Sequence, residues 1–522
     1  MKNRLFLLLL TLSFVRTATG QRPNFSEDIA AILYKNCSSC HHRGGIGPFP
    51  LMSYEDAYAQ RYGIQYAVSN GIMPPWPPDT AFQRYTHERI LREAEIQTLL
   101  DWVNNGAPQG DSTLAPDPPL FSDEALLGPP DLKLRIPLYR SKASGFDDYV
   151  CFVLPTGLTE GRWLRAVEVV PGDRSIVHHC LVFIDSAGNS QTDTVGGDCG
   201  GPAGDAGLVT AYVPGARPLV FPNGDQVKMG MRVAAGSQIV LNMHYPDGSA
   251  GRLDSTRVYL YFYPPGSSGI REVHAAAVLE NWNFCIDSGS IDTVTAAFPA
   301  GSATLPGDFS LLSVFPHMHL LGREISSWAT GPSGDTIPFV HVPDWQFDWQ
   351  DFYFFRKVVK LPAGSRLYAR GVYDNTSANP HNPHNPPQKV CAGPGTADEM
   401  FLVYFHYLEY RPGDEFIDLD SLMRVPTGLA SPAENPLSLR LWPNPGRDLL
   451  RLEWKMPHAG PVRLALYNLQ GRRMALLSDR QWSSGPQRLQ WHMGKAALPA
   501  GVYLLSGYIA GVTVSRKLVI AK

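Results

Sequence analysis

Two proline-rich stretches divide the 522-residue chain and limit how far any regular structure can extend. Between Ala107 and Pro130 there are prolines at positions 108, 116, 118, 119, 129 and 130, and a second break runs from Pro426 to Pro436. Proline lacks a backbone N–H and fixes φ, so neither a helix nor a central strand tolerates this density. The chain is therefore predicted to fold as three parts joined by linkers.

Hydrophobic spacing predicts different structures before and after the first linker. Before it, helical spacing over i, i+3, i+4 and i+7 is shown by Ile96, Leu99, Leu100 and Val103, and Gly106 follows as a stop signal. After it, residues 238–245 alternate, so that one face carries Ile239, Leu241, Met243 and Tyr245. The first pattern predicts a small all-α domain, and the second predicts strands.

Length and composition favour a multidomain, mainly β fold. At roughly 100–200 residues per domain, the chain holds several domains. Its 48 glycines and 45 prolines favour short strands and many turns. The β-like runs from 132 to 425 are too long for one sandwich and suit two. The predicted boundaries are 1–20, 22–110, 111–131 for the linker, 132–275, 276–425 and 437–522, the last a small β-sandwich.

The N-terminus predicts export. Lys2 and Arg4 precede an apolar run from Leu5 to Val15, and small residues at 18–20 offer a cleavage site. This is typical of a secretory signal peptide over residues 1–20, with an N-terminal anchor as the alternative. No later stretch is apolar for eighteen residues, so no integral membrane segment is expected in the mature chain. A net charge of −3 gives no reason to expect nucleic acid as a partner.

The segment Cys37-Ser-Ser-Cys40-His41 is the most specific local motif. Two thiols three positions apart can each form a thioether to a haem vinyl group, and the following histidine can ligate the iron. The alternative is a disulfide that happens to precede a histidine. Together with the helices on either side, the motif resembles the cytochrome c family, and this resemblance implies covalently bound haem c on residues 22–110.

A sixth iron ligand is expected from Met73, which stands before two prolines in Gly71–Trp76. A thioether ligand raises the reduction potential of haem iron. The rival, Met52, is expected to pack in the core. His42, next to the motif, is expected to face solvent.

Histidines and one methionine form a second group of candidate ligands between the linkers. His317 and His319 are two apart, so on a strand both project from one face and can bind one ion. His178 and His179 would point to opposite faces, so joint binding requires a bulge or a strand end there. Imidazoles with a soft thioether select copper over zinc or magnesium. The alternative is structural zinc or satisfied core histidines.

The order of four motifs carries a family resemblance across residues 132–425. His178-His179, His244-Tyr245, His317-Met-His-Leu-Leu-Gly322 and Asp398-Glu-Met400 succeed one another. They resemble the copper type II, ascorbate-dependent monooxygenases. The resemblance implies two tandem antiparallel, jelly-roll-like β-sandwich domains that face a cleft. It assigns an electron-transfer copper to His178, His179 and His244, and an oxygen-binding copper to His317, His319 and Met400.

The same resemblance bears on the substrate. Tyr404 matches a substrate-binding tyrosine of the family, although a core tyrosine is an equal alternative. Phe315 stands where the peptide-amidating members have an arginine, so peptide amidation is not expected. The implied partners are O₂, a small organic substrate, and an electron donor that is ascorbate-like or a redox protein. His381 and His384 lie in a Pro/Asn-rich loop and are interpreted as solvated.

The remaining cysteines and the tail complete the prediction. An odd number of cysteines is left for disulfides, with the pairing open: Cys151, Cys180, Cys199, Cys285 and Cys391. The tail motifs Leu441–Gly446, Leu466–Gly471, Leu498–Tyr503 and Lys517–Lys522 resemble the type A sorting domain of the type 9 secretion system. This resemblance implies that machinery as a partner, passage through the periplasm, and release to the cell surface or medium. The alternative is an adhesive β-sandwich.

These observations predict a secreted, haem-linked copper monooxygenase. Electrons would pass from haem to the three-histidine copper and on to the copper of His317, His319 and Met400. The haem domain is expected to dock transiently, because the linker 111–131 would act as a flexible tether. One alternative is a non-enzymatic extracellular redox protein that uses haem and copper for electron transfer or metal handling, and another is a pair of β domains that bind a ligand without turnover.

Overall fold

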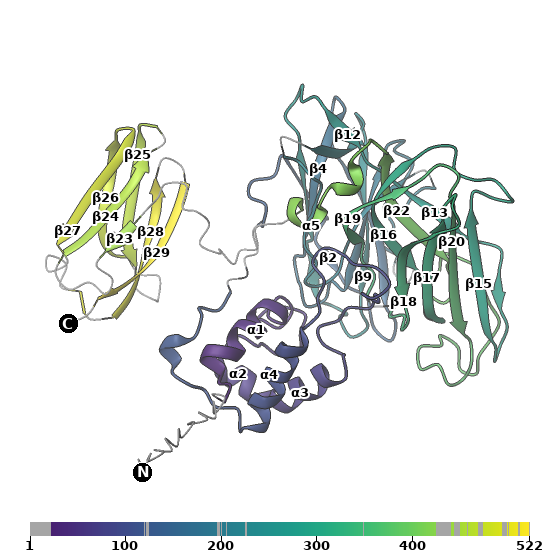
Figure 1. The fold of residues 1–522 in the computed structure, drawn as a ribbon, viewed down its shortest axis with the longest axis horizontal. Coiled ribbons are helices and arrows are strands. Elements are labelled where there is room, and N and C mark those ends of the chain that lie inside the picture. Colours follow the sequence, from purple (N-terminus) through teal and green to yellow (C-terminus); the bar gives the residue numbers. More distant parts are fainter. Residues whose placement is uncertain are drawn as a thin grey trace, which may run out of the picture. The chain divides into compact units, whose positions relative to one another are not determined.

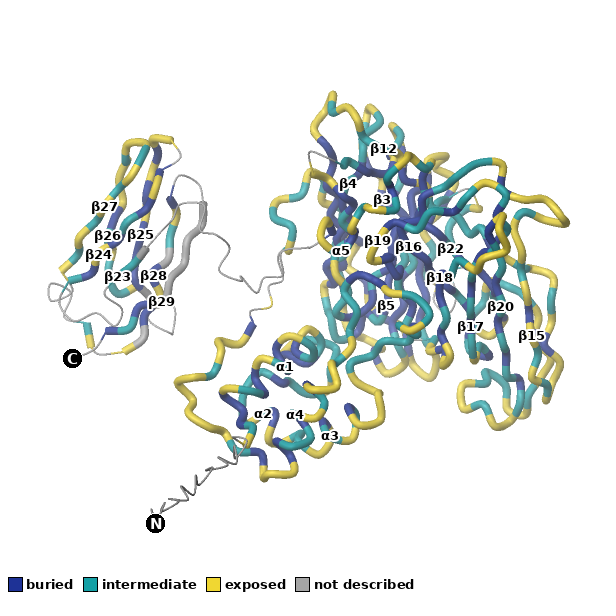
Figure 2. Tube along the Cα trace, viewed as in Figure 1, coloured by how far each residue is buried: buried dark blue, intermediate teal, exposed yellow. Residues whose placement is uncertain are grey.

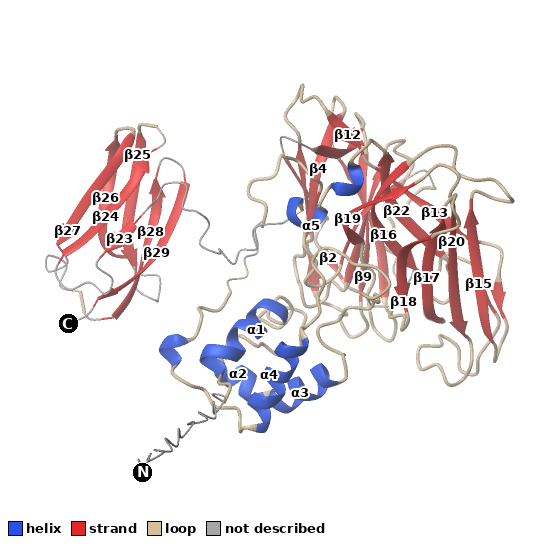
Figure 3. Ribbon diagram, viewed as in Figure 1, coloured by secondary structure: helices blue, strands red, loops and turns tan. Residues whose placement is uncertain are grey.

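A computed structural model gives the fold in two compact units, Met1–Gly428 and Leu429–Lys522 (Figure 1). It describes residues 22–119, 121, 125–195, 199, 201–204, 206–224, 227–347, 349–423, 440–442, 449–456, 458–467, 473–492, 498–499, 501–509 and 512–520. The predicted signal peptide and the break at 426–436 lie outside these residues. Of the described residues, strands make up 42% and helices 11%, which confirms a mainly β fold (Figure 3). Among the helices described, none is long and apolar enough to cross a membrane.

The α region, residues 22–110, packs its helices around one small core. It contains the π-helix η1 (Phe25–Ile29), α1 (Ala30–Asn36), α2 (Tyr54–Ala59), α3 (Arg61–Ser69) and α4 (Glu93–Asn104). Ile29, Leu33, Leu99 and Trp102 are fully buried there. Gly106 has φ +84°, a left-handed conformation that only glycine adopts without strain, and it follows the end of α4. The predicted amphipathic helix before the linker is confirmed.

The first β region, residues 132–272, contains two main sheets. One has the order β3 (Asp148–Pro155), β9 (Gln238–Tyr245), β5 (His179–Asp185), β6 (Gly207–Tyr212). The other has the order β1 (Leu132–Arg135), β11 (Arg257–Phe262), β4 (Arg162–Val170), β8 (Lys228–Val233), β12 (Ile270–Glu272), with β7 (Leu219–Val220) beside β4. A short pair joins β2 (Tyr139–Arg140) to β10 (Leu253–Asp254). All pairs are antiparallel except β8 with β12.

The second β region, residues 274–423, is also built from antiparallel sheets. One has the order β13 (His274–Glu280), β22 (Leu402–Glu409), β16 (Phe309–His317), β19 (Tyr353–Leu361). The other has the order β15 (Ile291–Phe298), β20 (Arg366–Asp374), β17 (Gly322–Thr330), β18 (Thr336–Val342). A short pair joins β14 (Cys285–Ile286) to β21 (Val390–Cys391), and the 3-10 helix η3 (Asp414–Phe416) and α5 (Leu419–Leu422) follow β22.

One apolar core crosses from the first β region into the second. Phe221 belongs to the first region and Phe315 and Phe352 to the second, yet all three are buried in the same cluster. The fully buried His406 links the two regions through a 3.0 Å hydrogen bond between its Nε2 and the Val209 carbonyl. Burial therefore continues across the boundary (Figure 2), and the two regions pack as one body.

A segment of the α region, residues 79–89 between α3 and α4, is built into the second β region. We call it the docking segment. Tyr85 is 1% exposed, donates its hydroxyl to the Phe339 carbonyl at 2.8 Å, and forms an isolated β-bridge with Phe355. The Thr86 amide donates to the Phe354 carbonyl at 2.7 Å. Contact between the α and β regions thus has a fixed element beside the linker, which the sequence analysis did not foresee.

The C-terminal unit is a separate β structure with its own core. Its strands are β23 (Arg440–Trp442), β24 (Leu449–Met456), β25 (Gly460–Tyr467), β26 (Arg473–Trp482), β27 (Gly485–His492), β28 (Gly501–Ile509) and β29 (Val512–Ile520). They form one sheet in the order β23-β24-β27 and another in the order β26-β25-β28-β29. Parts of all four proposed sorting motifs lie outside the described residues, at 443–446, 468–471, 500 and 521–522.

The cysteines outside the CxxCH motif form two disulfides. Cys151 pairs with Cys199, and Cys285 pairs with Cys391. Cys180 is buried and belongs to neither bond. The odd count read from the sequence therefore leaves one thiol, and it lies on β5 directly after His179.

Candidate metal centres

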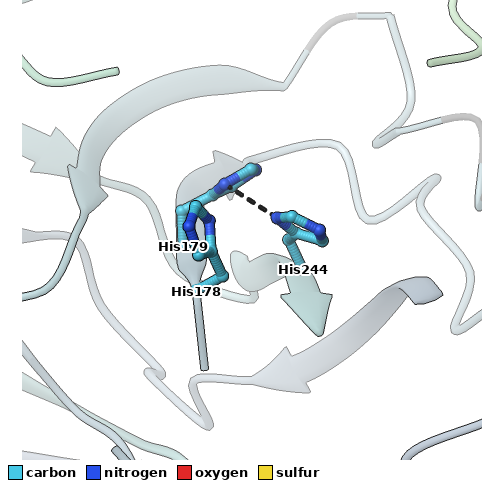
Figure 4. Close-up of side chains that lie close together, drawn as sticks. All are labelled: His178, His179 and His244. Atoms are coloured by element: carbon cyan, nitrogen blue, oxygen red, sulfur yellow. Dashed lines mark hydrogen bonds between the residues drawn. The ribbon is translucent and has the colours of Figure 1, made fainter. Parts of the chain in front are cut away.

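Three histidines meet at one end of the first β region (Figure 4). His179 is the first residue of β5 and is paired in register with His244 on β9. His178 stands just before the strand begins, and its amide donates to the His244 carbonyl at 3.0 Å. One ring nitrogen from each of the three lies within 4.8 Å of the others. The strand end that joint binding requires is thus present. It allows the consecutive side chains of His178 and His179 to approach the same position.

The electrostatics of this cluster suit a metal ion. His179 Nδ1 and His244 Nδ1 are 3.2 Å apart, so the two rings direct the same type of nitrogen at each other. Burial, followed by the neighbouring histidines, lowers the pKa of His179 well below its usual value. The His179 ring is therefore held neutral, which is the state that binds metal. The donor set of three imidazoles fits copper or zinc.

Asp147 contacts the outer ring nitrogen of His244. Its Oδ2 lies 3.1 Å from His244 Nε2, and the bond to His244 is the main cause of the lowered pKa of Asp147. Tyr149 stacks on the same ring, with centroids 4.3 Å apart and planes 2° from parallel. A carboxylate on the outer nitrogen of a ligating histidine fixes its tautomer and orients the ring. His244 Nδ1 is therefore the nitrogen that would face a metal.

Asp147→Asn is expected to weaken copper binding at the three-histidine cluster about 10–100-fold, because it removes the charge that orients His244. Competition with a chelator of known affinity measures the effect. Asp287→Asn is the control, because the Asp287 carboxylate is 73% exposed and pairs with Lys389 in the second β region. Equal copper affinity in the Asp147 variant and the native protein would show that Asp147 does not support the site.

A second cluster lies at one end of the second β region. His317 is the last residue of β16, His319 follows two residues later, and Met400 stands just before β22. His317 Nε2 is 3.2 Å from Met400 Sδ. The rings of His317 and His319 have centroids 5.0 Å apart and stand nearly perpendicular, at 87°. The structure thus brings these three predicted ligands together.

Each histidine of this second cluster has one nitrogen held by the protein. His317 Nδ1 bonds to Gln350 Oε1, and His319 Nδ1 bonds to the Asp398 carbonyl at 3.0 Å. These bonds assign metal binding to the Nε2 atoms. Burial, then His319, lowers the pKa of His317 to about 3, so its ring is neutral at physiological pH. Two imidazoles and a thioether form a donor set that favours copper.

Glu399 ties the two halves of this cluster together. Its carboxylate accepts backbone hydrogen bonds from His319 at 2.9 Å, Leu321 at 2.6 Å and Met400 at 3.3 Å. Burial raises the pKa of Glu399 to about 8, although the three donors oppose this shift. The turn after β16 and the segment before β22 are therefore held by one side chain. The sequence motif contains Glu399 but gave no hint of this role, and nothing in the sequence pointed to Asp147 or Gln350.

The two clusters lie in β regions that share one apolar core. Burial lowers the pKa of His179, and His244, His178 and then His317 add to this shift.

The other candidate residues of this region have different surroundings. Tyr404 is paired in register with Phe315, and their rings lie 6.0 Å apart. The ring of Phe315 is also stacked with the ring of His317, with centroids 6.2 Å apart. The second cluster therefore has an apolar side chain next to it. His406 bonds to Ser313 Oγ at 2.7 Å and has a structural position between the β regions. His381 is exposed, as expected.

The CxxCH motif, which is predicted to attach haem, follows directly after α1. Cys37 and Cys40 are both free thiols, so the motif is not a disulfide here. His41 Nδ1 lies 3.0 Å from the Phe49 carbonyl, which assigns iron binding to Nε2. A Cβ on Gly47 would lie 2.7 Å from His41 Nδ1, so glycine is needed beside this ring. The residues present therefore fit a haem group.

The structure leaves the prediction for Met73 untested and contradicts the prediction for His42. Met73 follows α3, its amide donates to the Ala67 carbonyl at 3.3 Å, and its side chain is 39% exposed. Its role as iron ligand stays a prediction. The expectation that His42 faces solvent is wrong. His42 is 8% exposed because the linker residue Phe121 stacks on its ring at 4.1 Å.

One family model matches part of the chain. Residues 300–417 match the model of the copper type II ascorbate-dependent monooxygenase, C-terminal domain. The matched residues include His317, His319 and Met400, and the match supports a copper monooxygenase-like function and hence an oxidoreductase. A search of curated proteins found no match.

Two solved structures align with the chain at low similarity. The crystal structure of the infectious bursal disease virus VP2 subviral particle aligns with 10% identity, 56% of this chain, 79% of that chain and a TM-score of 0.14. The Bacillus subtilis oxalate decarboxylase aligns with 8% identity, 59% of this chain, 82% of that chain and a TM-score of 0.09. Both TM-scores lie far below that of a shared fold.

Proposed function

We propose that the protein is an exported copper monooxygenase that hydroxylates a C–H bond of a small organic substrate and receives electrons through a covalently attached haem c. The observation that supports this best is the cluster of His317, His319 and Met400, with Nε2 to Sδ at 3.2 Å, inside the matched residues 300–417. The three-histidine cluster supplies the second copper of the proposal. Two tandem β-sandwiches would carry the two ions.

The bound metals supply one-electron chemistry and the activation of O₂. Hydroxylation of one C–H bond consumes one O₂, two electrons and two protons, and it releases one water. The protein's part is to hold neutral imidazoles at fixed angles, through Gln350 and the Asp398 carbonyl, and to limit water at the second cluster with Phe315. Fixed ligands reduce the reorganisation that each electron transfer requires.

The substrate is proposed to be a small molecule rather than a peptide with a free carboxylate. Phe315 is 1% exposed and apolar, so it offers no charge to a carboxylate beside His317. Tyr404, packed against Phe315, is proposed to contact the substrate. Its pKa is raised by burial, so the hydroxyl stays protonated and can donate a hydrogen bond.

Haem attachment and export belong to the same proposal. Cys37 and Cys40 would form the two thioethers, His41 would bind the iron, and Met73 would be the sixth ligand. The N-terminal residues 1–20 would direct the chain to the periplasm, where c-type haem is attached. The C-terminal unit would then carry it through type 9 secretion to the cell surface or the medium.

A metal and haem assay followed by O₂ uptake tests the function. Purified protein is expected to hold two coppers and one haem per chain and to consume O₂ in proportion to product across a panel of C–H donors. Copper and haem without O₂ uptake would favour the alternative of an electron-transfer or metal-handling protein. Zinc at both clusters would contradict the copper assignment.

Met73→Ala is expected to abolish the thioether-to-iron charge-transfer band of the oxidised protein while haem stays attached, because the thioethers of Cys37 and Cys40 do not depend on the sixth ligand. Absorbance and a denaturing haem stain measure the two properties. Met52→Ala is the matched control, since its backbone carbonyl accepts from Tyr34 and its side chain is the rival ligand. Loss of the band in the Met52 variant instead would reverse the assignment.

A further inference from the structure

The haem-attachment motif touches the first β region at one turn. Cys40 Sγ lies 3.6 Å from the Pro214 carbonyl oxygen. A Cβ on Gly215 would lie 2.8 Å from Cys40 Sγ and 3.4 Å from Ser39 Oγ. Gly215 has φ +74°, so the turn uses the left-handed conformation of glycine and also leaves room for the sulfur. This is a close contact between the α region and the turn after β6.

Arg89, at the end of the docking segment, holds this turn in place. Its Nη2 donates to the Gly215 carbonyl at 2.7 Å, and its guanidinium lies 4.8 Å from the ring centre of Trp349. Trp349 precedes Gln350, the residue that holds His317. The Ala216 amide closes the turn on the Val213 carbonyl at 2.8 Å. The contact is thus fixed from both β regions.

The turn follows β6, the strand that pairs with β5, on which His179 of the three-histidine cluster lies. Two residues before Pro214 stands Tyr212, the last residue of β6, which is paired in register with Cys180 on β5. Cys180 is bonded in the chain to His179. Burial raises the pKa of Tyr212. Tyr212 therefore lies on the strand next to β5, opposite the residue that follows His179.

We propose that Tyr212 and the Pro214–Gly215 turn form the route by which electrons pass from haem at Cys40 to the metal at His179. This inference rests on the proposed function, which places haem and copper at those residues. The α region then works as a fixed donor, held by residues 79–89, rather than as a carrier that docks and leaves. Tyr212 is proposed as a positioning residue, because its partner on β5 is Cys180 and not a predicted ligand.

The step is a simple electron transfer. With haem held by Cys37, Cys40 and His41 and copper held by the three histidines, one electron would leave the ferrous haem, leaving it ferric, and would reduce a cupric ion to the cuprous state. No proton is exchanged, and Tyr212 keeps its hydroxyl proton because its pKa is raised. Haem attachment converts the Cys40 thiol to a thioether, so the contact with the Pro214 carbonyl becomes a packing contact of the same sulfur.

Two variants of Tyr212 test the route. Protein with oxidised copper is flash-reduced at the haem without O₂ or substrate, and the haem absorbance is followed at several protein concentrations. The native protein and Tyr212→Phe are expected to reoxidise at a similar, concentration-independent rate, since both keep the ring. Tyr212→Leu is expected to be severalfold slower with unchanged copper content. An unchanged rate in Tyr212→Leu would overturn the route, whereas haem that stays reduced in the native protein would contradict the proposed relay itself.

The turn is tested separately, with a readout that needs neither haem nor copper. In protein produced without haem attachment, Gly215→Cys is expected to form a disulfide with Cys40, detected by peptide mass mapping under non-reducing conditions. Gly224→Cys is the control, because a Cβ there meets nothing within 4 Å. Absence of the Cys40 bond in the Gly215 variant would overturn the contact.

A glycine-to-alanine pair covers the case in which Tyr212→Leu fails to fold. In the haem-loaded, copper-loaded protein, Gly215→Ala is expected to slow haem reoxidation, because the new methyl group pushes Cys40 away. Gly236→Ala carries a similar backbone strain, at φ +76°, with nothing within 4 Å. It is expected to leave the rate unchanged, and equal rates in both variants would count against the route.

Discussion

His317→Ala is expected to abolish O₂-dependent product formation and to reduce the copper content from two ions to one per chain. His317 Nε2 faces Met400 Sδ at 3.2 Å, and its other nitrogen is held by Gln350, so no other side chain can take its place. Loss of an outer-sphere partner alone typically costs 10–100-fold in metal affinity or activity, so loss of a ligand is expected to cost more than about 100-fold. Product formation and elemental analysis measure the two effects.

The exposed loop histidine gives a matched control for this variant. His381→Ala removes an imidazole from the same β region but is expected to leave both copper ions and the turnover rate unchanged, because His381 is exposed. The three-histidine cluster should keep its ion in the His317 variant, since His178, His179 and His244 come from the other β region. Full turnover with one copper would contradict the assignment of the oxygen-binding site.

Local periodicity predicted part of the arrangement of the candidate ligands. His317 and His319 stand two apart at the end of a strand, and alternation places such residues on one side. For His178 and His179 the same rule required a bulge or a strand end, and β5 does begin at His179. The amphipathic helix before the linker and the strands of the C-terminal unit followed from period and turn residues as well.

Contacts between distant segments could not be predicted in this way. Asp147 reaches His244 across about a hundred residues, and Gln350 reaches His317 from the segment before β19. Neither pair has a spacing that marks it, because the partners meet only when separate strands pack. The docking segment is a similar case, since residues 79–89 lie between α3 and α4 and meet the second β region only when the chain folds. The environment of His42 also depended on a distant residue, Phe121.

Tyr85→Ala is expected to release the docking segment and to lower the free energy of unfolding of the first unit by roughly 3–5 kcal/mol, the usual cost of removing a buried aromatic ring. Tyr85 is 1% exposed and packs against Tyr353 and Phe355, with ring centroids 5.5 Å and 6.1 Å away. Tyr85→Phe removes only the hydroxyl that donates to Phe339 and is expected to cost roughly 1–3 kcal/mol, because a buried carbonyl loses its donor.

Hydrogen exchange gives a local measure of the same effect. The Thr86 amide donates to the Phe354 carbonyl at 2.7 Å, and the Asp79 amide donates to the His341 carbonyl at 2.8 Å. Both amides should exchange faster in Tyr85→Ala, remain protected in Tyr85→Phe, and be unaffected in Tyr62→Ala, whose ring is 65% exposed. Unchanged protection of Thr86 in Tyr85→Ala would mean that the ring does not hold the segment. Faster exchange together with slower haem reoxidation would tie the fixed position of the α region to electron transfer, because Arg89 could no longer hold the turn against Cys40 once the segment is released.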